Sequence, residues 1–296
     1  MTVLEWYRNH KNLHRWKMSN FYKMVGISKQ GHYKQVKRLD SNSLMEDDIL
    51  KKAAIIRKEH KRMGCRKLYS QIQPIGMGRD KTEQVLLSNG FGIQVKKNRV
   101  RTTYAGVHRF KNLISGHSIN DINQVWVSDI TYIPVDYKRH YYLTLIQDVY
   151  SRLIVGWSLS DNMLTQNTVK KAYQMAIERR KRRIPDLIFH SDRGSQYGSS
   201  IIQQIHKIYN VRPSMGNKAW ENAHAESLNG VLKNEYITLD KFTGSLSSAQ
   251  KQTKKWIDLY NKNRPHGSLK NQKPEKYETF LQGLAPEERP ILTINY

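Results

Sequence analysis

Hydrophobic and polar positions divide the chain into a helical first part and a strand-rich second part. Apolar side chains recur at helical spacing over residues 44–62, 65–73 and 79–88, and Gly90 ends the last of these predicted helices. Further upstream, residues 3–40 predict short basic helices. One of them ends near Val25 at Gly26, and Ser28 caps the next after a tight turn. The first part of the chain is therefore expected to be all-helical.

From Gln124 onward the pattern changes to runs of β-branched and aromatic residues, which are typical of strands. Three such runs with short turns between them predict an antiparallel meander. A helix capped by Thr165, a short strand, a helix, a fifth strand and a last helix follow. The predicted ranges are 125–135, 140–150, 152–160, 165–180, 187–192, 199–209, 211–215 and 222–237. This order predicts an α/β fold, a mixed sheet flanked by helices, behind a small all-α region.

These patterns predict four parts of the chain. Residues 1–110 form a basic, helical, DNA-binding region, and residues 111–122 form a linker. Residues 123–240 form the catalytic core, and residues 241–296 form a helical extension of the core with a tail.

The charge of the chain predicts a polyanionic partner. The 296 residues carry a formal net charge of +25, and residues 1–120 hold 25 basic and 8 acidic side chains, a net +17. A field of this strength attracts polyanions, of which nucleic acid is the commonest. The single cysteine, Cys65, excludes a disulfide framework and a cysteine-rich zinc site and suits a reducing cytoplasm. Neither a signal peptide nor an apolar run of membrane-spanning length is present, so no membrane partner is expected.

The basic first part contains two candidate DNA contacts. A helix, a glycine turn and a basic helix form the helix-turn-helix pattern, although an ordinary helical hairpin gives the same signal. The start of the second helix offers four side chains for base contacts, Lys29, Gln30, His32 and Lys34. A like-charged arm suited to following a phosphate backbone carries Lys96, Lys97, Arg99 and Arg101.

Three carboxylates in the second part are candidates for chemistry. Asp129 interrupts an apolar strand, where an ionised group is costly unless a cation or a hydrogen bond compensates. Asp192 follows the carboxyl end of a strand, where active sites of open α/β sheets gather, although it could also cap a turn. Glu226 lies on the last core helix, where a solvated position is the plain alternative. Together they form the ligand set that suits Mg²⁺ or Mn²⁺, with two ions expected.

Other polar residues surround these carboxylates in the predicted fold. Asn222 and Lys233 share a helix face with Glu226, one turn before it and two turns after it. Arg193 directly follows Asp192. We expect Arg193, Asn222 and Lys233 to contact DNA.

Several motifs resemble the retroviral-integrase-like core of bacterial insertion-sequence transposases, in particular the second-frame (OrfB) proteins of the insertion-sequence-three family. They are WVSDITYIP, YYLTLIQDVYSRLIVGWSLS, HSDRGSQY, SMGNKAWENAHAESLNGVLKNE and YNKNRPHGSL. The resemblance spans residues 17–280 and implies a ribonuclease-H-like fold with an Asp, Asp, Glu (DDE) triad. By motif position the triad is Asp129, Asp192 and Glu226. The stretch before Asn222 is shorter than in many relatives, which leaves the conformation of that loop open.

The expected reaction is metal-dependent cleavage of DNA at the ends of an insertion sequence, followed by strand transfer. A ribonuclease-H-like nuclease or resolvase without strand transfer is an alternative, as is a non-catalytic DNA-binding regulator derived from a transposase. We expect double-stranded DNA, both element ends and target, as partner and a homo-oligomer on it. The resemblance also implies a further partner, the product of an upstream frame.

Overall fold

Five strands form the mixed sheet of the core. β2 (Val125–Pro134), β3 (His140–Asp148) and β4 (Ile154–Ser160) pair antiparallel in succession, whereas β5 (Ile188–Ser191) runs parallel to β2 and β6 (Arg212–Met215) runs parallel to β5. The strand order is β4-β3-β2-β5-β6. The predicted meander and the ribonuclease-H-like mixed sheet are thereby confirmed.

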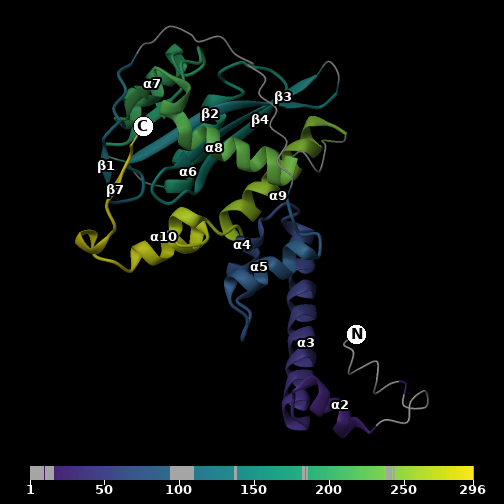
Figure 1. The fold of residues 1–296 in the computed structure, drawn as a ribbon. Coiled ribbons are helices and arrows are strands. Elements are labelled where there is room, and N and C mark those ends of the chain that lie inside the picture. Colours follow the sequence, from purple (N-terminus) through teal and green to yellow (C-terminus); the bar gives the residue numbers. More distant parts are fainter. Residues whose placement is uncertain are drawn as a thin grey trace.

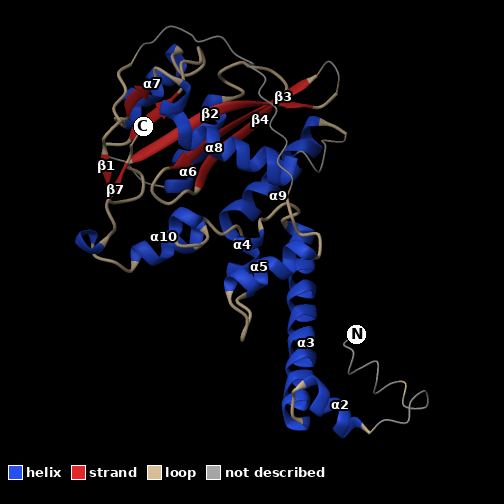
Figure 2. Ribbon diagram, viewed as in Figure 1, coloured by secondary structure: helices blue, strands red, loops and turns tan. Residues whose placement is uncertain are grey.

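The structure, a computed structural model, describes residues 17–93, 110–136, 139–181, 186–237 and 244–295, together with His10, Ile184 and Phe242. Helices surround the sheet, and a long helix leads away from it (Figures 1 and 2). None of the helices in these ranges is long and apolar enough to cross a membrane.

Each face of the sheet is covered by its own pair of helices. α6 (Val169–Arg180) and α7 (Ser200–Tyr209) bury their apolar sides against one face, in a cluster that includes Trp126 and Ile146. On the other face, α8 (Ala223–Leu232) and α9 (Leu246–Lys262) pack on side chains that alternate with the first set along the strands, including Leu143, Leu145 and Ile154. Successive side chains of a strand point to opposite faces of the sheet, and both faces are buried. The strands are therefore almost continuous apolar runs in the sequence.

The contact between α6 and β4 requires a glycine. A Cβ atom at Gly156 would lie 2.1 Å from the carbonyl oxygen of Ala172. The helix backbone therefore approaches the strand more closely than any side chain would permit.

The start of α6 corrects the sequence prediction. The helix begins at Val169 and not at Thr165, and its N-cap residue, Thr168, makes no side-chain capping bond. The Thr168 hydroxyl instead donates to the carbonyl of Leu164 at 2.9 Å, and the Thr168 carbonyl accepts from the Ser158 hydroxyl at 2.7 Å. These bonds hold residues 164–168 in turns that precede the helix.

The helical region consists of α2 (Met18–Val25), α3 (Lys29–Glu59), α4 (Cys65–Ile72) and α5 (Arg79–Ser88). Gly26 adopts the left-handed conformation (φ 72°) that ends α2, and the Ser28 hydroxyl accepts from the Gly31 amide at 2.9 Å at the start of α3. The predicted turn and both caps are confirmed. The C-terminal half of α3 packs on α4 and α5 through a separate apolar core, which includes Ile49, Ala53, Leu68 and Leu86.

The prediction of two separate helices between residues 28 and 62 is wrong, because α3 is one helix of 31 residues. The polar run Ser41–Ser43 contains neither glycine nor proline, so it weakens a helix without ending it. The ion pair between Asp48 and Lys52, at 2.7 Å and four residues apart, supports the middle of the helix. Figure 1 shows α3 extending from the core with α2 at its far end.

Buried polar contacts attach the helical region to the core. The Nδ1 atom of His60 lies 2.9 Å from the Tyr236 hydroxyl. Lys67 lies 3.7 Å from Glu235, whose carboxylate also accepts two hydrogen bonds of 2.7 Å from Arg264. Tyr236 and Glu235 belong to a short π-helix, Lys233–Ile237, that continues α8. The helical region therefore contacts the extension of the helix that carries Glu226.

The C-terminal part packs against the core and pairs with the segment that precedes β2. α10 (Pro274–Gln282) follows α9, and β7 (Leu292–Thr293) pairs antiparallel with β1 (Ser118–Ile119). The segment expected as a linker thus contains a strand, and its residues Ile114 and Ile119 are buried.

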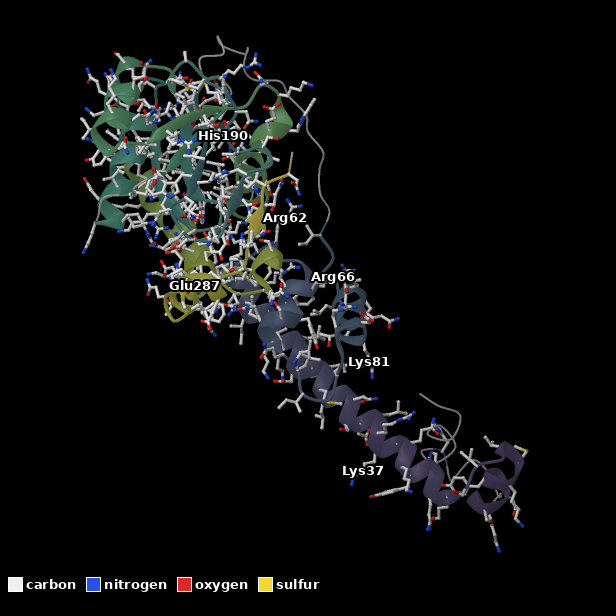
Figure 3. All side chains as sticks on the ribbon, turned by 90° about the vertical axis from the view of Figure 1, so that its left-hand side faces the viewer. Lys37, Arg62, Arg66, Lys81, His190 and Glu287 are labelled. Carbon is white, nitrogen blue, oxygen red and sulfur yellow. The ribbon has the colours of Figure 1, made fainter. Side chains whose placement is uncertain are left out.

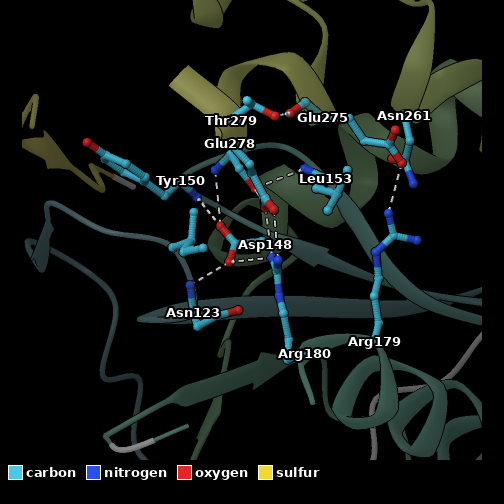
Figure 4. Close-up of polar contacts among 12 residues, drawn as sticks. Asn123, Asp148, Tyr150, Leu153, Arg179, Arg180, Asn261, Glu275, Glu278 and Thr279 are labelled. Atoms are coloured by element: carbon cyan, nitrogen blue, oxygen red, sulfur yellow. Dashed lines mark hydrogen bonds and ion pairs between the residues drawn. The ribbon is translucent and has the colours of Figure 1, made fainter. Parts of the chain in front are cut away.

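A buried ionic network fastens α10 to the sheet (Figure 4). Arg180 donates two hydrogen bonds of 2.8 Å to the Glu278 carboxylate and lies 3.5 Å from Asp148. Asp148, at the end of β3, also accepts from the amides of Asn123 and Ser151, at 2.6 and 3.0 Å. Because the cation is shared by two buried carboxylates, the network depends on Arg180.

Candidate active site

The parallel pairing of β2 and β5 brings two of the three carboxylates together. The register places Ser128 opposite Ser191, so the next residues lie side by side: Asp129 within β2, and Asp192 just past the end of β5. The Asp129 Oδ1 atom accepts from the Ile130 amide at 2.8 Å, and the Asp192 Oδ1 atom accepts from the Gly194 amide at 3.0 Å. Both carboxylates are thus oriented by the backbone.

Two asparagines of the last core helix fix α8 across β2. Asn222, at its N-cap, donates to the Ser128 carbonyl at 3.1 Å, and Asn229 donates to the Asp129 Oδ2 atom at 2.7 Å. The two asparagines are seven residues, about two helical turns, apart. Glu226 lies between them in the first turn and is exposed. The third carboxylate is thereby held next to the first two.

The electrostatics show that the three carboxylates repel one another. Burial, and then the charge of Asp192, raise the pKa of Asp129 to about 7. Burial also raises the pKa of Asp192, and burial together with Asp192 raises that of Glu226. A divalent cation would remove this repulsion and compensate for the buried charge.

The carboxylates fit such an ion in kind, because hard oxygen ligands suit Mg²⁺ and Mn²⁺. Within the described ranges, the side chains as placed do not converge into a set of three that could already hold a metal. Glu226 is exposed and long, so its side chain can turn toward Asp192 without a change in the backbone.

A buried histidine supports the strand that leads to Asp192. The ring of His190 lies 2.8 Å from the Ser214 hydroxyl of β6 and 3.0 Å from the carbonyl oxygen of Glu221. Burial lowers the pKa of His190 to about 4, so the ring is neutral at pH 7. His190 therefore joins β5, β6 and the entry to α8 without adding a charge. Figure 3 shows it inside the core.

The short stretch before Asn222 forms a closed loop. The guanidinium of Arg193 donates to the carbonyl and side chain of Asn217 at 2.7 and 2.8 Å. The Asn217 amide donates in turn to the Glu221 carboxylate at 2.7 Å. These hydrogen bonds join the loop after Asp192 to the loop before α8. They define the conformation of the stretch before Asn222, which the sequence did not predict.

The structure separates the residues expected to contact DNA into two groups. Arg193, Asn222 and Lys233 lie near the carboxylates, but Asn222 is buried and Arg193 is engaged with Asn217. Burial lowers the pKa of Lys233, and the charge of Asp129 opposes this effect. Lys96, Lys97, Arg99 and Arg101 lie outside the described residues.

The four residues at the start of α3 lie far from the carboxylates (Figure 1). Lys29, Gln30 and Lys34 are exposed. His32 is buried, and its Nδ1 atom lies 3.4 Å from the Tyr22 hydroxyl of α2. This histidine fastens α2 to α3 in the structure.

Asn229 is the site residue that the sequence did not indicate. Its spacing of seven residues from Asn222 is the signal that could have identified it, since both positions face β2. Its second amide atom, Oδ1, is buried without a hydrogen-bond partner in the described structure.

We expect Asn229→Ala to lower DNA cleavage about 10- to 100-fold, because partners of metal-binding carboxylates typically contribute this much. Without the amide, Asp129 loses the bond that fixes its Oδ2 atom. Initial rates at saturating Mg²⁺ measure the effect, and Gln174→Ala, which removes an exposed amide side chain of α6, is the control. Equal rates for the two variants would show that Asn229 has no positioning role.

The chain is similar to known integrase cores and insertion-sequence proteins. A model described as "Integrase core domain" matches residues 120–219, and a second model of the same description matches residues 208–274. The chain is 32% identical over 273 residues to the "Insertion element IS600 uncharacterized 31 kDa protein" of Shigella sonnei, covering 86% of this chain and 97% of that protein.

Two further relatives are described as transposases. The chain is 30% identical to the transposase for insertion sequence element IS904 of Lactococcus lactis, over 82% of this chain and 98% of that protein. It is 38% identical to the transposase InsF for insertion sequence IS3A of Escherichia coli, over 53% of this chain and 54% of that protein.

Proposed function

The chain belongs to the insertion-sequence-three family of DNA transposases, which have an integrase-like catalytic core, and we propose that Asp129, Asp192 and Glu226 are its DDE triad. The observation that carries this assignment is the electrostatic coupling of three carboxylates from β2, the end of β5 and α8. Burial raises the pKa of each, and the charge of Asp192 raises those of Asp129 and Glu226 further. Groups with such perturbed pKa values are concentrated at functional sites.

Enzymes with this core use divalent metal ions, and we propose that two Mg²⁺ or Mn²⁺ ions bind between the triad carboxylates. When bound, the ions would neutralise charge at the reacting phosphate and activate the attacking oxygen. The chain's own contribution is position. Backbone amides and Asn229 fix Asp129, the Gly194 amide fixes Asp192, and Glu226 closes the site from the exposed side.

The reaction consists of two phosphoryl transfers. In the first, water hydrolyses a phosphodiester at the element's end and leaves a 3′-hydroxyl group. In the second, this hydroxyl attacks a phosphodiester of the target, so one bond forms as another breaks and the displaced strand leaves with its own 3′-hydroxyl. Most of the catalysis comes from a site that holds the attacking oxygen and the leaving oxygen in line on opposite sides of the phosphorus atom.

We propose that DNA extends from the triad to the helical region. Lys233 would contact a phosphate near the triad, whereas Lys29, Gln30 and Lys34 would contact bases or phosphates at the start of α3. A homo-oligomer on DNA and a partner encoded by an upstream frame belong to the same proposal. We propose that the enzyme acts in the bacterial cytoplasm, where the DNA of the element and of its target would lie.

A strand-transfer assay tests this function. The protein is incubated with a duplex carrying the element's terminal repeat and a supercoiled plasmid, with Mg²⁺ or with EDTA. We expect joined products with Mg²⁺ and none with EDTA. Cleaved but unjoined duplex would favour the nuclease alternative, and binding without cleavage would favour the regulator.

The pKa of Asp129 predicts a pH dependence. Since its pKa is raised to about 7, the metal-free carboxyl holds a proton below pH 7, and a metal ion must displace that proton. At limiting Mg²⁺ we expect cleavage to rise as the pH increases through about 7. Higher Mg²⁺ should move the midpoint to lower pH. Rates measured from about pH 6 to about pH 8.5 at two Mg²⁺ concentrations check this, and identical midpoints would contradict it.

A further inference from the structure

A groove runs along the outer face of α8, beside the catalytic face. A hollow of about 560 Å³ lies between α4 and α8, and a second of about 240 Å³ lies between α8, the turn that joins β3 to β4, and the end of α9. Ser227 and Val231 line both hollows, so the two form one depression. Because Ser227 directly follows Glu226 in the helix, the groove begins next to the triad.

Basic side chains outnumber acidic ones in the wall of this groove, and apolar atoms form much of the remaining surface. Arg62, Arg66 and Lys67 line the hollow near α4, and Figure 3 shows Arg62 and Arg66 where the helical region meets the core. Two acids also line it: Glu83 lies 3.4 Å from Arg66, and Glu235 is paired with Arg264 and lies 3.7 Å from Lys67, so the basic groups remain in excess.

The second hollow has cationic and neutral polar groups in its wall. Arg152, Ser227, Ser268 and two histidines line it, and the described residues of its wall include no acid. Burial and the nearby charge of Arg152 lower the pKa of His224 to about 3, and burial with Arg264 and then Arg152 lowers that of His266 to about 3. Burial is the main cause of both shifts, and the charge of Arg152 leaves this hollow with a positive potential that attracts an anion.

The floor of the groove contains a glycine that neither the backbone conformation nor the packing of the chain requires. Gly230 lies inside α8, where alanine would form a better helix, and a Cβ atom there would meet nothing within 4 Å. Its backbone conformation is not one that requires glycine, since its φ is not positive. An open space above a helical glycine is suited to the close approach of another backbone.

We propose that this groove binds the sugar-phosphate backbone of one DNA strand, which runs from the triad over Gly230 between Arg152 and the α4 side chains Arg66 and Lys67. DNA is the occupant that the charge favours, because a phosphodiester chain is narrow, continuous and anionic. The inference rests on the proposed function in one respect, namely that DNA reaches Glu226. It places one strand on a surface formed by both the core and the helical region.

Matched charge insertions test the groove. Ser227→Glu places a carboxylate in it, whereas Ser247→Glu places one on an exposed position of α9. In metal-free buffer, we expect Ser227→Glu to weaken binding of a terminal-repeat duplex at least about tenfold, since like charges in contact are strongly unfavourable. Ser247→Glu should have little effect. A random-sequence duplex run in parallel shows whether the strand belongs to the element or to the target, according to which duplex is affected.

A second variant separates binding from folding. Gly230→Ala is expected to keep or raise the Tm, because the new methyl group meets no atom and favours the helix, and yet to weaken DNA binding. Glu226→Gln should bind both duplexes normally while losing cleavage, so failure of the triad assignment and failure of the groove give different results. Equal binding by Ser227→Glu, Ser247→Glu and the unmodified protein, or full binding by Gly230→Ala, would overturn the proposal.

Discussion

Asp192→Asn and Glu226→Gln are each expected to lower DNA cleavage at least about 10³-fold, because removing a single group that stabilises transition-state charge commonly has this effect. Each substitution keeps the size of the side chain and removes one oxygen ligand with its charge. In Asp192→Asn the Gly194 amide can still donate to the carbonyl oxygen of the new side chain, so the loop after β5 should keep its conformation. Single-turnover cleavage of a terminal-repeat duplex in Mg²⁺ measures the loss.

The control for these variants is an acid elsewhere on the core. Glu178→Gln lies at an exposed position of α6 and should cleave at the unmodified rate. Glu235→Gln is unsuitable as a control, because that carboxylate holds Arg264 and Lys67. Cleavage by Asp192→Asn within tenfold of the Glu178→Gln rate would remove Asp192 from the triad.

Arg180→Ala is expected to destabilise the protein by about 3–5 kcal/mol, the usual cost when one partner of a buried ion pair is removed. The variant leaves Asp148 and Glu278 buried near each other without their shared cation. Denaturant unfolding followed by circular dichroism gives the free energy of unfolding.

The neighbouring arginine supplies the matched control for that experiment. Arg179 pairs with Glu275 at 2.9 Å, but both side chains are more than a third exposed, at 39% and 36% (Figure 4). Arg179→Ala should therefore cost no more than about 1 kcal/mol. Equal losses for the two variants would mean that the network around Arg180 does not hold α10 to the sheet.

Much of the core could be predicted from local patterns. Runs of β-branched, aromatic and other apolar residues located the five strands of the sheet, and the positions of Gly26 and Ser28 located the turn before α3. These signals are local, because each depends on a few neighbouring residues. The carboxylates could be proposed for the same reason, since Asp129 interrupts a strand, Asp192 follows the end of one, and Glu226 lies on a recognisable helix.

The remaining features depend on contacts between distant residues. The pairing of β1 with β7 joins segments more than 170 residues apart, as the hydrogen bond between Ser118 and Thr293 illustrates. α3 is continuous because Ser41–Ser43 contains no strong helix breaker. The low helix propensity of these residues alone wrongly suggested a helix end there. Asn229 was missed because its role appears only when α8 is placed across β2.

The central claim is that Asp129, Asp192 and Glu226 bind metal as one site. Fe²⁺ in place of Mg²⁺, with ascorbate and peroxide, generates hydroxyl radicals that cut the polypeptide beside the bound ion. We expect cuts near residues 129, 192 and 226 together, suppressed by excess Mg²⁺ and lost in the Asp129→Asn, Asp192→Asn double variant. Cuts confined to other parts of the chain, or unchanged in the double variant, would contradict the claim.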